Sequence, residues 1–152
     1  MRLRRPAPLA LVLALGLALV ATLTVGLAAW SWAQGQDQPR ARTVAITIHW
    51  SRFQPSEVRV AQGSTVRFVI RNTDPIDHEF ILGDLAVQEG EEAGTDLIHD
   101  GTVPGMVSAP AGRTVATVVS FARHPAERSL VYACHLPGHY AYGMRGVLTI
   151  TS

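Results

Sequence analysis

Hydrophobic and polar residues alternate along most of the chain after residue 42. In residues 43–50, for example, Val44, Ile46 and Ile48 fall on one side of an extended chain. A period of two residues is typical of a β-strand with one buried face. The same pattern predicts seven strands, over residues 43–50, 57–60, 64–71, 78–82, 113–121, 129–134 and 146–151.

Turn-forming residues separate most of these strands, and no stretch after residue 42 has helical periodicity over three turns. Many short strands joined by turns predict an all-β fold, an antiparallel sandwich or barrel. Residues 82–110 interrupt the pattern with five glycines and a cluster of acidic residues. We interpret them as a solvated excursion between two strands, with a functional loop as the alternative.

The N-terminus has the pattern of an export segment. Arg2, Arg4 and Arg5 precede residues 9–29, which carry no charge. A basic start followed by an apolar run is typical of a signal peptide or of a membrane anchor, and the length fits both. Small residues at Ser31 and Ala33 allow cleavage after Ala33.

The export segment defines the expected organisation of the chain. Residues 1–33 are a signal peptide or membrane anchor, residues 34–42 a polar linker, and residues 43–152 one domain. The arginines before the apolar run favour an outside location for the C-terminus. We therefore expect an extracytoplasmic domain, periplasmic or on the outer face of the cytoplasmic membrane, either soluble or anchored through residues 9–29.

The composition excludes several classes of protein. The chain has 152 residues, which suits one folded domain, and it is 47% hydrophobic and only 16% charged, which excludes a disordered tail protein. Its net charge is +1 and it contains no lysine, so it offers no basic face for nucleic acid. A single cysteine, Cys134, excludes an internal disulfide and leaves burial, reactivity, pairing with another chain or metal binding.

The candidate chemistry lies in residues 132–146, YACHLPGHYAYGMRG. Cys134 is followed after four residues by His139 and after four more by Met144, and His78 begins an earlier predicted strand. Thiolate and thioether are soft ligands and imidazole suits copper, and this set is that of a mononuclear electron-transfer copper site. Zinc gains nothing from a thioether, and iron–sulfur clusters need several cysteines. The sequence therefore predicts one copper ion bound by His78, Cys134, His139 and Met144.

With these residues the chain, from residue 44 to residue 150, resembles a cupredoxin, a small blue copper protein of the plastocyanin and azurin kind. The resemblance is carried by Phe53-Gln54-Pro55, AQGSTVRFVIRN, the DHEF segment around His78, and residues 134–146. It implies a Greek-key β-sandwich with one type 1 copper near one end. It also implies that His78, Cys134 and His139 are equatorial ligands and that Met144 is the axial ligand.

Two features depart from the family pattern. Residues 82–110 are long for the smallest members, and Asp77 and Glu79 flank the first ligand where the family often has neutral residues. These acidic residues are expected to affect the reduction of the site or the choice of partner.

The other candidate ligands are weaker. His135 follows Cys134 directly, so it points the opposite way on an extended chain and is not expected to bind copper. His49, His99 and His124 have no matching partners and are expected at the surface or in loops. Met106 is a rival thioether but lies in the long loop.

The function expected from these residues is that of a one-electron carrier, not an enzyme, with copper cycling between Cu(II) and Cu(I). By resemblance, the edge of His139 is the electron port, and its neighbours Pro137, Tyr140, Ala141 and Tyr142 form an apolar patch for transient docking of redox partners. The alternative is a copper delivery or scavenging protein, although such sites often have methionine or histidine runs, which this chain lacks. A nitrite reductase or oxidase would need a second metal site.

Overall fold

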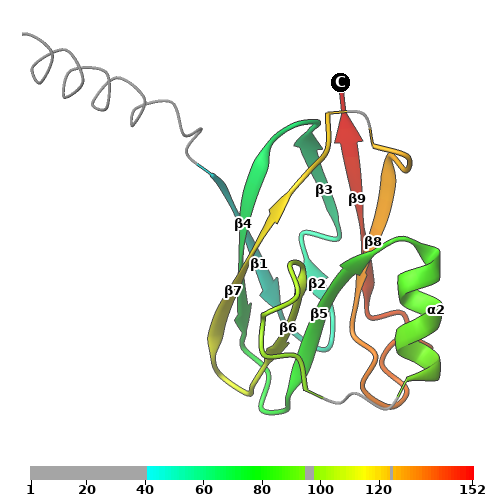
Figure 1. Ribbon diagram of the computed structural model, residues 1–152. Coiled ribbons are helices and arrows are strands. Elements are labelled where there is room, and N and C mark those ends of the chain that lie inside the picture. The colour runs from blue at the N-terminus through cyan, green and yellow to red at the C-terminus, as the bar shows by residue number, and fades with distance from the viewer. Residues whose placement is uncertain (1–40, 95–97, 124) are drawn as a thin grey trace, which may run out of the picture. The chain divides into compact units, whose positions relative to one another are not determined.

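The computed structural model describes residues 41–94, 98–123 and 125–152, which form two β-sheets packed face to face (Figure 1). The first sheet has the strand order β2 (Phe53–Gln54), β1 (Arg42–Ile48), β4 (Thr65–Asn72) and β7 (Thr114–Ser120). The second has the order β3 (Glu57–Ala61), β9 (Arg145–Thr151), β8 (Ser129–Ala133), β5 (His78–Gly83) and β6 (Met106–Ala109). The predicted all-β sandwich is confirmed, and each of the seven predicted strands is present to within two residues at either end.

The sheets are mixed and not purely antiparallel. β1 runs parallel to β4, and β3 runs parallel to β9, whereas the other pairs are antiparallel. The chain passes from one sheet to the other between β2 and β3 and again between β3 and β4. A strand that returns after such a crossing lies beside a strand distant in sequence, as in a Greek key, and alternation within single strands does not reveal these partners.

The core lies between the two sheets and follows the alternation in the sequence. Ile46 pairs with Ile70 across β1 and β4, and both side chains are buried. From the second sheet, Phe80 and Tyr132 stack with ring centroids 5.6 Å apart, and the Tyr132 hydroxyl donates to the Pro55 carbonyl at 2.8 Å. Gly146 lies opposite Tyr132, and any side chain there would overlap the tyrosine ring.

Every residue of β5 is buried, which is unusual for a strand of a two-layer sandwich. Phe80 and Leu82 belong to the core between the sheets. Glu79 and Ile81 point to the other face, which is covered by helix α2 (Leu85–Ala93) and the residues after it. The first predicted copper ligand therefore begins a strand that is shielded on both faces.

The interpretation of residues 82–110 as a solvated excursion is wrong. They contain α2 and β6, and β6 extends the second sheet by pairing with β5. The Asp84 side chain accepts the Val87 N–H at 3.0 Å and caps the helix. Gln88 is buried and donates to the Ile81 and Val131 carbonyls, which fastens the helix to the sheet.

The predicted signal peptide or membrane anchor over residues 1–33 and most of the predicted linker over residues 34–42 lie outside the described residues. Those assignments stay predictions. Among the residues that are described, no helix is long and apolar enough to cross a membrane.

Candidate metal centre

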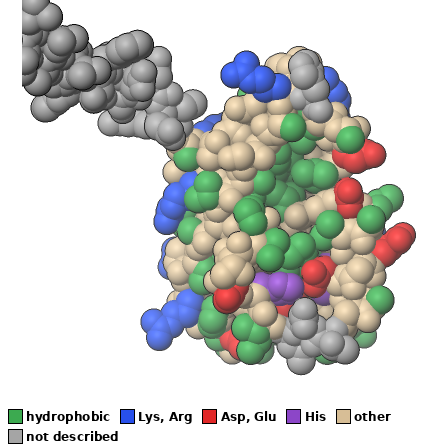
Figure 2. Space-filling view, viewed as in Figure 1, with side chains coloured by type: hydrophobic (Ala, Val, Ile, Leu, Met, Phe, Trp, Pro, Cys, Tyr) green, Lys and Arg blue, Asp and Glu red, His purple; other side chains and the backbone are tan. Residues whose placement is uncertain are grey.

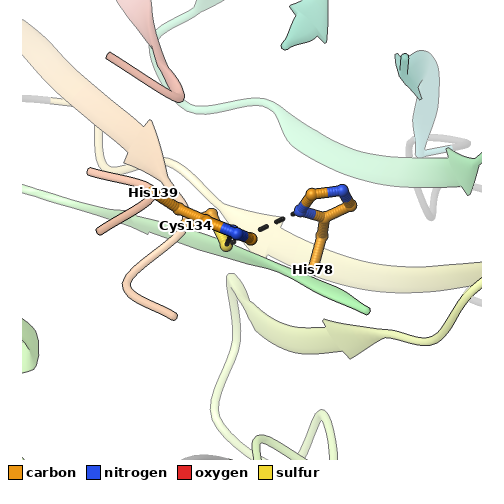
Figure 3. Close-up of side chains that lie close together, drawn as sticks. All are labelled: His78, Cys134 and His139. Atoms are coloured by element: carbon orange, nitrogen blue, oxygen red, sulfur yellow. Dashed lines mark hydrogen bonds between the residues drawn. The ribbon is translucent and has the colours of Figure 1, made fainter. Parts of the chain in front are cut away.

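Three of the predicted ligands converge at one end of the second sheet. His78 is the first residue of β5, Cys134 follows β8, and His139 lies in the loop before β9. Their ligand atoms all lie within 4.8 Å of one another, and Figure 3 shows the three side chains pointing together. The Cys134 Sγ lies 4.0 Å from His78 Nδ1 and 3.2 Å from His139 Nδ1. Both imidazoles therefore present the same nitrogen to the sulfur.

The loop after Cys134 brings His139 and Met144 back to the cysteine. Its turns pass through Gly138 and Gly143, both at φ +85°, a backbone conformation that favours glycine. The Met144 N–H donates to the His139 carbonyl at 3.0 Å, and the Cys134 N–H donates to the Met144 carbonyl at 3.2 Å. The Met144 side chain is fully buried. One loop thus places the fourth predicted ligand residue directly beside two of the other three.

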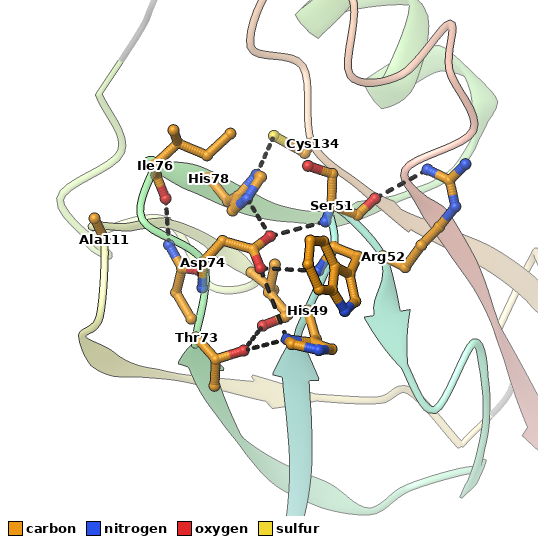
Figure 4. Close-up of polar contacts among 12 residues, drawn as sticks. His49, Ser51, Arg52, Thr73, Asp74, Ile76, His78, Ala111 and Cys134 are labelled. Carbon is orange, nitrogen blue, oxygen red and sulfur yellow. Dashed lines mark hydrogen bonds and ion pairs between the residues drawn. The ribbon is translucent and has the colours of Figure 1, made fainter.

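Asp74 orients the remaining predicted ligand, His78, from the side of the ring away from the sulfur (Figure 4). Its Oδ2 lies 3.0 Å from His78 Nε2, so this ring nitrogen donates to the carboxylate and leaves Nδ1 free to face the sulfur. The same carboxylate accepts the N–H groups of Trp50 and Ser51, each at 2.8 Å. Both residues have left-handed backbone angles, φ 54° and 51°, that turn these groups towards Asp74.

The electrostatics of Asp74 suit this role. Burial alone would raise the pKa of Asp74, but hydrogen bonds from the Ser51 and Trp50 amides, together with His78, lower it below its usual value. Asp74 therefore remains a carboxylate that fixes the orientation of His78. Sequence reasoning did not identify Asp74, because an aspartate within a turn-forming segment already has an ordinary explanation.

The sulfur of Cys134 lies in a dry environment. The residue is buried, and burial raises the pKa of its thiol to about 11. The Glu79 N–H donates to the sulfur at 3.4 Å. Burial and the neighbouring His78 lower the pKa of His139, which favours the neutral imidazole that binds metals.

The donor set fits copper. A buried thiol and two imidazole nitrogens lie close enough to share one ion. The buried Met144 is hydrogen-bonded through its backbone to two of these three residues. Soft sulfur with imidazole is the combination that copper electron-transfer sites use. When bound there, copper supplies a one-electron couple between Cu(II) and Cu(I).

The two flanking acidic residues have different environments. Asp77 is exposed and its Oδ1 accepts the Ala111 N–H at 2.8 Å. Glu79 is buried, and burial raises the pKa of its carboxyl group, while its Oε2 accepts the His135 N–H at 3.2 Å. Glu79 thus connects the cysteine sulfur, through its own N–H, to the residue that follows the cysteine.

The other histidines divide into three cases. His135 lies outside the ligand cluster, as expected, because its two ring nitrogens face Glu92 and Gln88 of α2 at 2.9 and 2.8 Å. His49 is at the surface, with 45% of its side chain exposed. His99 lies in the loop before β6, as expected, but only 11% of its side chain is exposed, and it lies against acidic residues of β5 and α2. His124 lies outside the described residues.

Comparison with known proteins agrees with this geometry. The model of the cupredoxin-like domain family matches residues 19–96. The chain belongs to the cupredoxin family. The match ends before Cys134, so the ligand loop supports the assignment independently of it.

Two curated relatives and the solved structures extend the comparison. The copper-resistant cuproprotein CopI of Rubrivivax gelatinosus is 35% identical over 114 residues, covering 72% of this chain and 66% of the relative, slightly under two thirds of its length. CopI of Pseudomonas aeruginosa is 28% identical over 143 residues, covering 72% of this chain and 76% of the relative.

Among solved structures, auracyanin B has a TM-score of 0.59 at 22% identity, covering 76% of this chain and 93% of that chain. The auracyanin of Roseiflexus castenholzii has a TM-score of 0.58 at 23% identity, covering 75% and 100%. These likenesses confirm the cupredoxin fold. Copper binding, with one ion in this centre, rests on the cupredoxin family, the cuproprotein relatives and the donor set.

Proposed function

We propose that this cupredoxin is an extracytoplasmic one-electron carrier. The observation that supports the proposal is that hydrogen bonds restrain all three clustered residues. The His78 ring donates to Asp74, the Cys134 sulfur accepts the Glu79 N–H, and the His139 backbone carbonyl accepts the Met144 N–H. Ligands that are fixed by the fold rearrange little when the charge of the ion changes. Small rearrangement favours rapid electron transfer over capture and release of the metal.

The ligand roles in this proposal follow the sequence. His78, Cys134 and His139 bind as equatorial ligands and Met144 as the axial ligand. Hydrogen bonds to the sulfur and the apolar surroundings of the site tune its reduction potential. Because Cys134 and His78 are buried, a substrate molecule lacks direct access between them, which supports a carrier in preference to an enzyme.

The electron enters and leaves through His139 in this account. His139 and Tyr140 are half-buried, whereas Pro137, Ala141 and Tyr142 are exposed, Tyr142 to 79%. These neighbours provide a largely apolar patch for short-lived contacts with donor and acceptor proteins, for which small interfaces are typical.

The second candidate is copper delivery or scavenging, which the names of the CopI relatives favour. The two functions differ in what leaves the site, an electron or the ion. The deciding experiment consists of two stopped-flow measurements on the reduced, copper-loaded protein. In one the protein is mixed with a small-molecule oxidant, and in the other with a strong Cu(I) chelator. A carrier reoxidises reversibly over many cycles and loses copper to the chelator orders of magnitude more slowly. Copper loss as fast as oxidation would overturn the carrier proposal and favour delivery.

A further inference from the structure

A second group of metal-binding side chains lies beside the copper centre, on the outer face of β5. Glu79 comes from β5, Glu91 from α2, and His99 from the segment that leads to β6. The His99 Nε2 lies 3.9 Å from the Glu79 Oε1 and 3.3 Å from the Glu91 Oε2. Figure 2 shows histidine and acidic side chains next to each other on the face that carries β5, β6 and α2.

Two of the atoms that face one another in this group, one from Glu79 and one from His99, are buried without a hydrogen bond to any described residue. The Glu79 Oε1 and the His99 Nε2 are both buried and neither makes a hydrogen bond among the described residues. The Glu79 side chain is only 3% exposed. A buried carboxylate oxygen without a partner is costly, and such an atom usually marks a bound ion or water.

The backbone fixes the position of His99. Its N–H donates to the Ser108 Oγ at 2.8 Å, and its carbonyl accepts the Ser108 N–H at 2.9 Å. Glu79 is equally fixed, since its other oxygen accepts the His135 N–H. Glu91 is the adjustable member, because 19% of its side chain is exposed at the rim of the group.

The other acidic residue on this side of α2 is already engaged. Glu92 lies 2.9 Å from His135 Nδ1, and the second ring nitrogen of His135 faces Gln88. The two groups are therefore separate. His135 with Glu92 and Gln88 fastens the helix, whereas Glu79 and His99 each leave one buried ligand atom without a hydrogen bond among the described residues.

We propose that Glu79, Glu91 and His99 form a second cation site that binds a divalent transition-metal ion of the zinc or cupric kind. One imidazole nitrogen and two carboxylate oxygens are ligands that these ions accept, and the two carboxylates supply the negative charge. A small movement of Glu91 closes the set around the ion. The site is distinct from the copper centre, which uses sulfur and two other histidines.

The position of the site gives it a consequence for the copper centre. The N–H of Glu79 donates to the Cys134 sulfur, so Glu79 is shared between the surroundings of both ions. A positive charge bound to its carboxylate favours the more electron-rich state of a nearby metal. Occupation of the second site therefore raises the reduction potential of the copper.

The test is a zinc titration of the full-length, copper-loaded protein. Copper occupies the first site, and zinc does not displace it because copper binds such ligands more tightly. Equilibrium dialysis against Zn²⁺ with metal analysis is expected to give one saturable zinc per chain, with the visible copper band retained. His99→Ala and Glu91→Gln are expected to weaken this zinc binding at least about tenfold, by loss of a ligand.

The matched control is Glu89→Gln, which removes an exposed acidic side chain from the same helix. It is expected to leave zinc binding unchanged, and a retained copper band shows that each variant is folded. Two results would overturn the proposal. One is the absence of saturable zinc binding, which would make the group an ion-pair network only. The other is zinc binding that survives both His99→Ala and Glu91→Gln. Neither result bears on electron transfer at the first site.

Discussion

Asp74 connects the turn after β4 to the metal centre without being a ligand. Its carboxylate fixes which nitrogen of His78 faces the sulfur and at the same time holds the backbone of Trp50 and Ser51. A carboxylate behind a ligating histidine orients the ring and makes it a stronger ligand. The site should therefore respond to changes at Asp74 although the ion never touches it.

Asp74→Asn is expected to lower copper affinity about 10- to 100-fold, because the amide replaces the charged acceptor of the His78 ring. Competition with a chelator of known affinity measures the loss. The control is Asp77→Asn, since Asp77 also precedes His78 closely but is exposed and accepts the Ala111 N–H instead of a hydrogen bond from His78. Equal losses in both variants would contradict an orienting role for Asp74.

The raised pKa of the Cys134 thiol determines how copper affinity is expected to depend on pH. With a pKa of about 11 the thiol carries its proton in the metal-free protein at neutral pH, so copper must displace this proton. The lowered pKa of His139 means that this ligand is already neutral above pH 7. Between pH 7 and pH 9 the logarithm of copper affinity is expected to rise by about one per pH unit.

The measurement is the same chelator competition, corrected for the protonation of the chelator and repeated with Cys134→Ser. The serine variant is expected to lose most of the slope. A wild-type slope near zero would mean that the metal does not displace the proton of the Cys134 thiol.

Single residues were the most predictable level of the site. His78, Cys134, His139 and Met144 stand out in the sequence because their chemistry and spacing are visible without a fold. Asp74 and the group around His99 were missed for the opposite reason. Their roles depend on which atoms face each other after β5, α2 and β6 have packed, and an aspartate in a turn has an ordinary explanation.

At the scale of elements, α2 and the strand ends decide the shape of the site. The helix covers the face of β5 that would otherwise expose Glu79 and Ile81. It was missed in the sequence because it has only nine residues, contains Gly90 and presents acidic residues on its exposed side. The two-residue strand β2 and the four-residue strand β6 were missed because a segment this short has too few residues for an alternating pattern to be recognised.

The position of helix α2 leads us to expect opposite effects on stability from two glycine-to-alanine substitutions. Gly90 lies within α2, and a methyl group there meets no atom within 4 Å, so Gly90→Ala is expected to stabilise the protein by about 0.5–1 kcal/mol. Gly83 lies at the end of β5, and the same methyl group would sit 2.5 Å from Val87 of the helix. Gly83→Ala is expected to destabilise it by about 1–3 kcal/mol.

Urea unfolding of the metal-free protein measures both changes. The pair is matched because each variant adds a single methyl group. Destabilisation by Gly90→Ala would contradict the helical conformation of this segment, and a neutral Gly83→Ala would contradict the close packing of α2 on β5.

At the scale of the whole domain, the metal centre and the β3–β4 turn lie at opposite ends of the sandwich (Figure 1). The ligand loop follows β8 at one end, whereas Gly63 of the β3–β4 turn pairs with the Ala122 carbonyl at the other. Because of this separation, a substitution at the far end can serve as a control for a substitution in the proposed docking patch. The strand pattern predicted the sandwich, but not the pairing of β1 with β4 or of β3 with β9, which only the packed molecule defines.

Ala141→Glu is expected to slow electron exchange with a partner protein at least several-fold, because a charge in the apolar patch must be desolvated on docking. The visible spectrum should not change, since Ala141 is exposed and outside the ligand set. Stopped-flow oxidation by a cytochrome or another redox protein measures the rate. The control is Ala122→Glu, an exposed alanine at the far end, which should leave the rate unchanged. Equal rates for Ala141→Glu and wild type with every partner tried would remove the patch from the account.

The most direct measurement is the visible spectrum of the full chain loaded with Cu(II), beside Cys134→Ser. The account predicts an intense sulfur-to-copper band with one copper per chain, bleached by ascorbate, restored on reoxidation and absent from the serine variant. A pale spectrum, or an intense band that survives in Cys134→Ser, would contradict a copper centre built on the buried thiolate.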